Sequence, residues 1–191
     1  MDLRDHLLEV QLRTEKNINT LFNIALKQIF EPSYLKKIDS TLHNTIKMQE
    51  VDDRHQNIIA YNKGSTIYIN KRPFGALPTK KKMNYILHEF VHVLQNMKRF
   101  FLFRGFKEIH NMTSDLYDIV DSNLVKSYPE FLTGKKVKIG SGGKFEILAY
   151  LMNNSIQWDA ITPEAKKKFI ATLREYDIFN LENQFWHDRL S

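Results

Sequence analysis

The 191-residue chain contains no cysteine. This absence excludes disulfides, thiolate metal ligands and cysteine nucleophiles. Proline and glycine are also scarce, at 5 and 7 residues, and no linker, repeat or low-complexity tract divides the sequence. The hydrophobic fraction of 42% is ordinary for a globular protein. We therefore predict one domain over residues 1–191, with a single hydrophobic core.

Long apolar runs are missing as well. The densest run, 100–106, is interrupted by Arg104 and is far shorter than the roughly 20 residues that span a bilayer. The first six residues, MDLRDH, are charged and lack the apolar core of a signal peptide. These features predict a cytoplasmic protein that does not enter a membrane.

Acidic residues are outnumbered, since 22 Asp and Glu accompany 28 Lys and Arg and give a net charge of +6. The lysines form several short clusters, such as 80–82 and 166–168. The simplest interpretation is a solvated lysine-rich surface. A nucleic-acid partner is an alternative that the net charge alone supports, because no DNA- or RNA-reading motif accompanies it.

Helical periodicity dominates what is present, so we predict an α+β fold that is mainly helical. The only good β signal is a hairpin of 57–61 and 66–70 around a turn at 62–65. We expect a helical N-terminal part (1–50), a central core (57–155) and C-terminal helices (160–191). The expected helices span 3–30, 33–48, 80–98, 114–125, 144–156 and 163–178; loops are expected at 73–78 and 127–143, with a short strand at 137–139, and 181–191 stays unassigned.

One segment carries a chemical pattern: His88-Glu89-Phe90-Val91-His92 is an HExxH motif inside a predicted helix. Residues four apart lie on one helix face, so both imidazoles can reach the same metal ion. Zinc lowers the pKa of a bound water to about 7, and Glu89 is placed to take its proton. The pattern predicts one Zn²⁺ held by His88 and His92, with Glu89 as the general base. The alternative is a pair of core histidines that bond each other or the backbone.

Such a site needs a third protein ligand. Glu146 is the best candidate, because it is the only acidic residue in the apolar segment 145–152 and a lone carboxylate there is costly. Ala149 lies on the same face and would let this helix approach the HExxH helix closely. His110 is the main rival for this ligand position; its other interpretation is a histidine in a loop. Further alternatives are Asp115, Asp118 and Asp121.

His88-Glu-Phe-Val-His92 followed by Glu146-Ile-Leu-Ala149 resembles the zincin metallopeptidases, within them the gluzincin branch. The resemblance covers roughly residues 57–155. It implies a small antiparallel or mixed sheet packed on the HExxH helix, and a polypeptide substrate that pairs with a strand edge. The implied substrate-binding residues are Thr66, Ile67, Tyr68 and Ile69. The chain lacks the third histidine of metzincins, and Tyr150 stands where gluzincins often carry an acidic residue that orients a ligand histidine.

These features predict a zinc metallopeptidase, in which Glu89 assists attack by a zinc-bound water on a peptide bond. The tetrahedral oxyanion needs a further donor, for which Tyr150, His110 and Tyr117 are candidates. The loop Gly140-Ser-Gly-Gly143 is either a helix entry or a lid over the cleft. Two alternatives stay open. One is a catalytically dispensable structural or assembly protein, and the other is a SprT-like protease of nucleic-acid-bound proteins, which a role for His110 as a ligand would favour.

Overall fold

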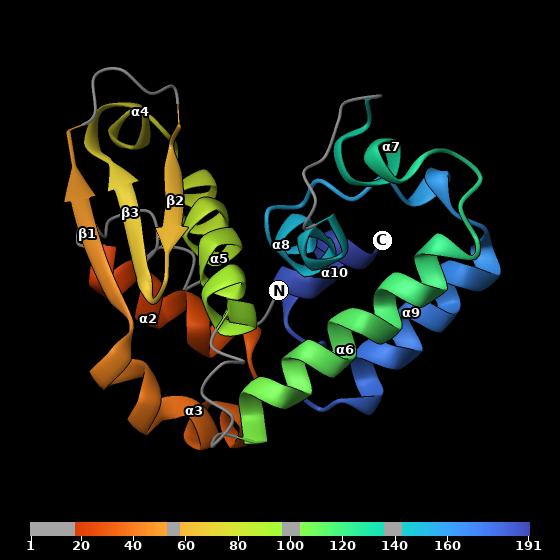
Figure 1. Ribbon diagram of the computed structural model, residues 1–191, viewed down its shortest axis with the longest axis horizontal. Coiled ribbons are helices and arrows are strands. Elements are labelled where there is room, and N and C mark those ends of the chain that lie inside the picture. Colours follow the sequence, from red (N-terminus) through yellow and green to blue (C-terminus); the bar gives the residue numbers. More distant parts are fainter. Residues whose placement is uncertain (1–17, 53–57, 97–103, 136–142) are drawn as a thin grey trace.

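The computed structural model describes residues 18–52, 58–96, 104–135 and 143–191 (Figure 1). Most of this part is helical, and it contains one three-stranded sheet. The fold is therefore α+β and mainly helical, as the sequence predicts. Its elements are α2 (Ile18–Ile29), α3 (Pro32–Thr45), β1 (Lys47–Val51), β2 (Ala60–Lys63), β3 (Thr66–Asn70), α4 (Lys71–Gly75), α5 (Thr79–Asn96), α6 (Arg104–Asp121), α7 (Tyr128–Thr133), α8 (Glu146–Met152), α9 (Pro163–Glu175) and α10 (Gln184–Leu190), with 3-10 turns at Gly143–Phe145 and Trp158–Ala160.

The sheet has the order β1-β3-β2, with β3 in the middle. β3 pairs in parallel with β1 and antiparallel with β2, so the sheet is mixed. The β2–β3 hairpin is the one the sequence predicts. Its turn is tighter than expected, because only Gly64 and Ser65 lie between the strands, and Gly64 has a φ of 61° that suits glycine. One face of the sheet buries Ile67 and Ile69.

α5 covers β2 and β3 and lies between the sheet and the C-terminal half of the chain (Figure 1). Apolar residues at helical spacing bury most of its surface. On the side toward α2, Phe90 contacts the rings of Phe22 and Phe30 at 4.9 and 5.9 Å between centroids. Buried aromatic rings of this kind fix the direction in which the rest of α5 faces.

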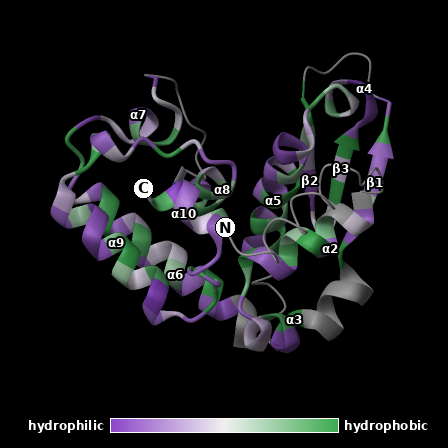
Figure 2. Ribbon diagram, turned by 180° about the vertical axis from the view of Figure 1, so that it is seen from behind, coloured by the Kyte–Doolittle hydropathy of each residue, from purple (hydrophilic) through white to green (hydrophobic). Residues whose placement is uncertain are grey.

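The C-terminal half consists of helices that pack on one another, with α6 against α9 and α8 against α5. Figure 2 shows hydrophilic and hydrophobic stripes alternating along α6 and α9. α10 packs on α2, because Trp186 on α10 is fully buried and donates a hydrogen bond to the carbonyl of Ile29 at the end of α2. The two halves therefore share one continuous core.

Two predicted element boundaries in the first half of the chain are wrong. The helix expected over 33–48 ends at Thr45, and Lys47–Val51 forms β1 instead. The sequence KMQEV has weak strand propensity, so its extended form depends on pairing with β3. The loop expected at 73–78 also begins inside a helix, since α4 spans Lys71–Gly75. Tertiary pairing overrides local propensity in the first of these cases.

α6 begins at Arg104, ten residues before the expected start at 114. His110 therefore lies on a helix and not in a loop, which corrects that prediction. Thr113 is inside the helix, and its hydroxyl donates to the carbonyl of Ile109. The buried residues Ile109, Met112, Leu116 and Val120 share one helix face.

The loop expected over 127–143 contains α7, with a capping box between Ser127 and Glu130 and Gly134 at its C-terminal end. The strand expected at 137–139 and most of the glycine loop, 140–142, lie outside the described residues. α9 begins as predicted, with Thr162 as its cap and Pro163 in its first turn. The unassigned tail forms α10. Within the described ranges, no helix has the length and apolar character that crossing a membrane requires.

Candidate metal centre

Two helices bring the candidate ligands together. His88 and His92 lie one turn apart on α5, on the side that faces α8 and away from Phe90. Both side chains are only 15% exposed. Glu146 is the first residue of α8 and is 27% exposed. Ala149 is fully buried, as expected of a small residue where the two helices approach closely.

The three side chains form a compact triangle of possible ligand atoms. The Nε2 atoms of His88 and His92 are 3.3 Å apart, and Oε2 of Glu146 lies 3.7 and 3.4 Å from them. Ligand atoms about 2.0–2.2 Å from a tetrahedral zinc are roughly 3.3–3.6 Å from one another. Within the described part of the chain, this is the group of histidine and acidic side chains that could hold a metal ion. The donor set of two imidazoles and one carboxylate fits zinc.

The protonation of these groups suits a cation. Burial, together with the charge of His92, lowers the pKa of His88 to about 4, so its ring is neutral at pH 7. Burial alone would lower the pKa of His92, but its hydrogen bond to Glu146 and the charge of that carboxylate outweigh burial and raise it. Burial would raise the pKa of Glu146, but the two histidines lower it. The carboxylate is therefore ionised at neutral pH.

A chain of hydrogen bonds holds the ring of His92. Its Nδ1 lies 3.2 Å from Oε1 of Gln95, whose Nε2 donates to the hydroxyl of Thr113 on α6. An amide oxygen only accepts, so Nδ1 of His92 carries the proton and Nε2 is free to bind a metal. The sequence alone did not predict this role of Gln95. The spacing could have indicated it, because Gln95 lies three residues after His92 on the same helix.

Glu89 lies on the sheet side of the same site and is 8% exposed. Its Oε2 accepts a hydrogen bond of 2.9 Å from Nδ2 of Asn62 on β2, and Oδ1 of Asn62 accepts one from Asn96. Burial raises the pKa of Glu89, and the hydrogen bond from Asn62 offsets part of this rise. A raised pKa brings a carboxylate closer to the range of a general base at neutral pH. The sequence pattern placed Asn62 in the hairpin turn, and only the pairing of the strands reveals its contact with Glu89.

A pocket of about 300 Å³ opens beside the triangle. Its walls come from β2, α5 and the start of α8. Its volume is at the lower end of the range for ligand pockets. Two of the three candidate ligands therefore face open space that a substrate could enter. The lining residues are Asn62, His92, Gln95, Asn96, Phe145 and Glu146.

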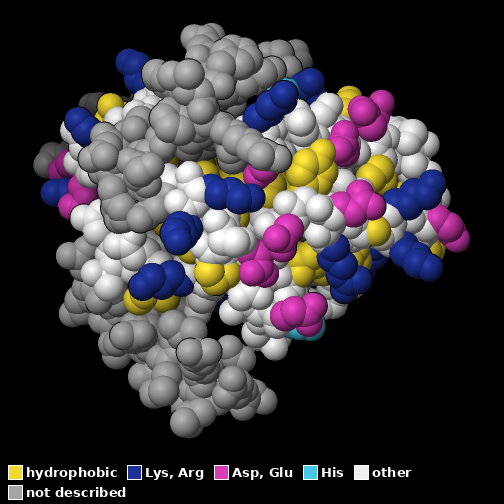
Figure 3. Space-filling model, turned by 90° about the horizontal axis from the view of Figure 1, so that it is seen from below, with side chains coloured by type: hydrophobic (Ala, Val, Ile, Leu, Met, Phe, Trp, Pro, Cys, Tyr) yellow, Lys and Arg dark blue, Asp and Glu magenta, His cyan; other side chains and the backbone are white. Residues whose placement is uncertain are grey.

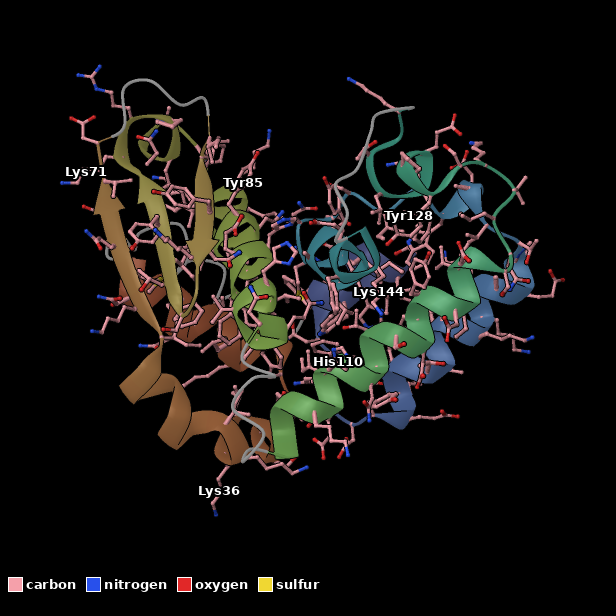
Figure 4. All side chains as sticks on the ribbon, in the orientation of Figure 1. Lys36, Lys71, Tyr85, His110, Tyr128 and Lys144 are labelled. Atoms are coloured by element: carbon pink, nitrogen blue, oxygen red, sulfur yellow. The ribbon has the colours of Figure 1, made fainter. Side chains whose placement is uncertain are left out.

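Of the two further candidate residues Tyr150 and His110, only Tyr150 lies beside the triangle of ligand atoms. The Tyr150 ring lies 5.4 Å from that of His88, edge to face, and burial together with Glu146 raises the pKa of its hydroxyl. Tyr150 is thus beside the triangle as a protonated donor. The ring of His110, on α6, packs against Phe145, and His110 is not a member of the triangle (Figure 4).

The acidic rivals to Glu146 also lie elsewhere. Asp115 accepts a hydrogen bond from Tyr176 on the side of α6 that meets α9. Asp121 accepts one from Tyr117 on the exposed surface of the same helix, and Asp118 is exposed. Tyr117, a candidate oxyanion donor, has its hydroxyl bonded to Asp121. None of these three aspartates belongs to the group formed by the described histidines and acids.

The strand that was expected to pair with substrate is not an edge strand. Thr66, Ile67, Tyr68 and Ile69 lie on β3, which is the central strand and pairs with β1 and β2 along its length. Its backbone has no free edge for a further strand. β2 pairs only with β3 among the described strands, and it carries Asn62 toward Glu89. The edge that adjoins the candidate metal centre is therefore β2.

Comparison with known proteins adds no relative: no family model, no curated protein and no solved structure matches the chain.

Proposed function

We propose that this protein is a zinc-dependent metallopeptidase of the zincin type, with one Zn²⁺ held by His88, His92 and Glu146. The observation that carries the proposal is the triangle of ligand atoms, whose sides of 3.3, 3.4 and 3.7 Å are close to the roughly 3.3–3.6 Å expected around a tetrahedral zinc. Three protein ligands leave the fourth position open, as in catalytic zinc sites. A small mixed sheet beside the HExxH helix and an acidic ligand on a later helix support the gluzincin resemblance.

In this proposal the ion supplies Lewis acidity at the scissile carbonyl and lowers the pKa of water. The protein's own groups handle the proton. Glu89 accepts it from the attacking water and passes it to the leaving amine. The hydrogen bond from Asn62 fixes the Glu89 carboxylate in place. The hydroxyl of Tyr150, kept protonated by its raised pKa, is the donor for the developing oxyanion.

The substrate in this proposal is an extended polypeptide that adds to the outer edge of β2. The backbone N–H of Asn70 donates to the carbonyl of Ile59, which places residues 59, 61 and 63 in hydrogen-bonded pairs with β3. Ala60 and Asn62 therefore direct their backbone N–H and C=O groups away from β3. In this proposal they pair with a peptide that passes the pocket.

Two other functions have less support. A purely structural metal site would have no use for a buried carboxylate held beside it by Asn62, as Glu89 is. A SprT-like protease would use a third histidine, and His110 lies outside the triangle. The charge of +6 is not gathered on the face seen in Figure 3, where the described basic and acidic side chains are interspersed. The metallopeptidase is the function that accounts for both the triangle and Glu89.

The test combines metal analysis with digestion of a peptide library by the purified full chain. We expect one zinc per chain and cleavage that a chelator abolishes. Glu89→Gln should keep the zinc and lose about 100-fold or more in turnover, because the general base is gone. Glu146→Ala should lower the zinc content. Glu175→Gln, the same acid-to-amide change as Glu89→Gln at an exposed position, is the control and should alter neither property.

The proposal fails if the purified chain holds no zinc and acquires none when zinc is supplied. It also fails if Glu89→Gln cleaves peptides as fast as the wild-type chain. Full retention of zinc by Glu146→Ala would remove Glu146 from the ligand set.

A further inference from the structure

We infer that Asn153 is a positioning residue for the metal: its side-chain amide orients His88 and sets which ring nitrogen carries the proton. This inference rests on the proposed metal site. Asn153 follows α8 directly, and its Nδ2 lies 3.1 Å from Nδ1 of His88. The gluzincin resemblance does not predict it, since the acidic partner of those proteins would stand at position 150, where this chain has tyrosine.

The contact as it stands suits a ring without metal. An amide N–H that donates to Nδ1 of His88 requires the ring proton to be on Nε2. That nitrogen lies 3.7 Å from the Glu146 carboxylate, which can accept the proton in a hydrogen bond through a small movement. The same proton blocks Nε2 from binding a cation. With the amide in this orientation, Nε2 of His88 could not be a ligand.

One observation indicates the opposite orientation: Oδ1 of Asn153 is buried without a hydrogen-bond partner among the described residues. A half turn of the amide exchanges its oxygen and nitrogen. The oxygen would then accept a hydrogen bond from Nδ1–H of His88, and Nε2 would be free for the metal.

Metal-binding histidines donate their second ring N–H to an acceptor, which fixes both tautomer and orientation. Gln95 provides this acceptor for His92. Asn153 provides it for His88, so each ligand histidine has its own amide partner. His88 protonated at Nδ1 then presents the lone pair of Nε2 to the ion.

The backbone beneath Asn153 is held in place, so only its amide needs to move. The guanidinium of Arg189 on α10 is 2% exposed and donates twice to the carbonyl of Met152, at 3.0 and 2.9 Å. It also donates to Oδ1 of Asn84 at 2.7 Å, and Nδ2 of Asn84 lies 3.4 Å from the carbonyl of Asn153. This network ties the turn after α8 to α5 and α10.

The experiment measures zinc affinity of the full chain by competition with a chromophoric chelator. Asn153→Leu keeps the size of the side chain and removes the acceptor, so we expect a loss of about 10- to 100-fold in affinity. Asn153→Asp keeps an acceptor and should bind within a few-fold of wild type. Asn23→Leu makes the same change at an exposed position of α2 and should have no effect.

Two spectroscopic measurements separate positioning from a general loss of structure. With Co²⁺ in place of zinc, the visible absorption bands should change in Asn153→Leu and return in Asn153→Asp. Nitrogen NMR of the zinc-loaded wild-type chain should show His88 protonated at Nδ1 and coordinated through Nε2. This second measurement needs no variant, so it applies even if Asn153→Leu does not fold.

The inference is overturned if Asn153→Leu folds and binds zinc within threefold of wild type, or if Asn153→Asp loses as much affinity as Asn153→Leu. NMR that shows coordination of His88 through Nδ1 overturns it as well. If the wild-type chain binds no zinc at all, the proposed function itself fails. If the wild-type chain binds zinc and Asn153→Leu binds it equally well, only this inference is contradicted and the proposed function stands.

Discussion

His88 and His92 lie on the same helix and face the same carboxylate, yet their pKa values shift in opposite directions. His88 is further from Glu146 and responds mainly to burial, which lowers its pKa to about 4. His92 is closer to that carboxylate, which raises its pKa against the effect of burial. Without metal, there is therefore a pH range in which the ring of His92 is protonated and the ring of His88 is neutral.

This difference predicts the pH dependence of zinc binding. Zinc needs a neutral imidazole, and the raised pKa of His92 means that its proton persists above the ordinary value of 6.5. Affinity should therefore be full above that raised pKa and fall by about tenfold for each pH unit below it. His88 adds no further loss until the pH approaches 4.

A competition titration between pH 5 and 8 measures this dependence as the slope of log affinity against pH. We expect a slope of one proton below the pKa of His92. A slope of two near pH 6 would contradict the assignment, because it would mean that both rings hold protons there. Calorimetry in buffers of different ionisation enthalpy provides an independent count of the protons released.

At the residue scale, the sequence predicted the groups that carry charge but not the amides around them. The HExxH spacing fixes His88, Glu89 and His92 on one helix, and Glu146 was identified from the cost of a lone carboxylate in an apolar segment. Asn62 and Asn153 lie outside the HExxH helix. Asparagine is common in turns and on surfaces, so its type carries no signal until tertiary structure places it.

Among the elements, β2 has the most direct connection to the proposed substrate. It is an edge strand, it borders the pocket through Asn62, and its outward backbone groups are those of Ala60 and Asn62. Proline at an outward position removes one N–H from that edge and leaves the ladder to β3 intact. Ala60 is chosen for this change, because the side chain of Asn62 bonds Glu89.

We predict that Ala60→Pro raises KM for peptide substrates by about fivefold to tenfold, the value of one backbone hydrogen bond. Its zinc content and melting temperature should stay close to wild type, and these measurements are the control for folding. A matched substrate in which an ester replaces the paired amide should show a similar loss with the wild-type chain. Unchanged KM in both experiments would mean that substrate does not pair with β2.

The elements themselves were predictable where periodicity was strong. α5 and the β2–β3 hairpin were found within a few residues of their observed bounds. β1 was missed, because its residues have no strand pattern and its partner is a strand further along the chain. The early start of α6 was missed, although its apolar face was present in the sequence. α7 had a readable capping box that the glycine-rich surroundings obscured.

Over the whole molecule, α10 joins the helices that carry the candidate ligands. Arg189 bonds the carbonyl of Met152 at the end of α8 and the side chain of Asn84 on α5. Its guanidinium also lies over the ring of Phe185, and its Nη1 donates to the carbonyl of that residue. A buried guanidinium with several carbonyl partners cannot be replaced by lysine, whose ammonium lacks the planar fork.

We predict that Arg189→Met lowers the free energy of unfolding by about 2–4 kcal/mol, because it leaves the Met152 carbonyl and Asn84 without their donor. Arg189→Lys should recover little of this loss. Urea unfolding of the metal-free chain is the measurement, and Arg174→Met, an exposed change on α9, is the control. A stability of Arg189→Met equal to that of the control would show that these hydrogen bonds contribute nothing net.

The separation of the three candidate ligands along the chain has a thermodynamic consequence. His92 and Glu146 are 54 positions apart, so an ion bound by both would close a large loop. By chain-entropy arguments, a tie across a loop of this length restricts the unfolded state by about 4 kcal/mol. A chain without cysteine would thereby possess a removable cross-link, made and broken by the supply of metal rather than by oxidation.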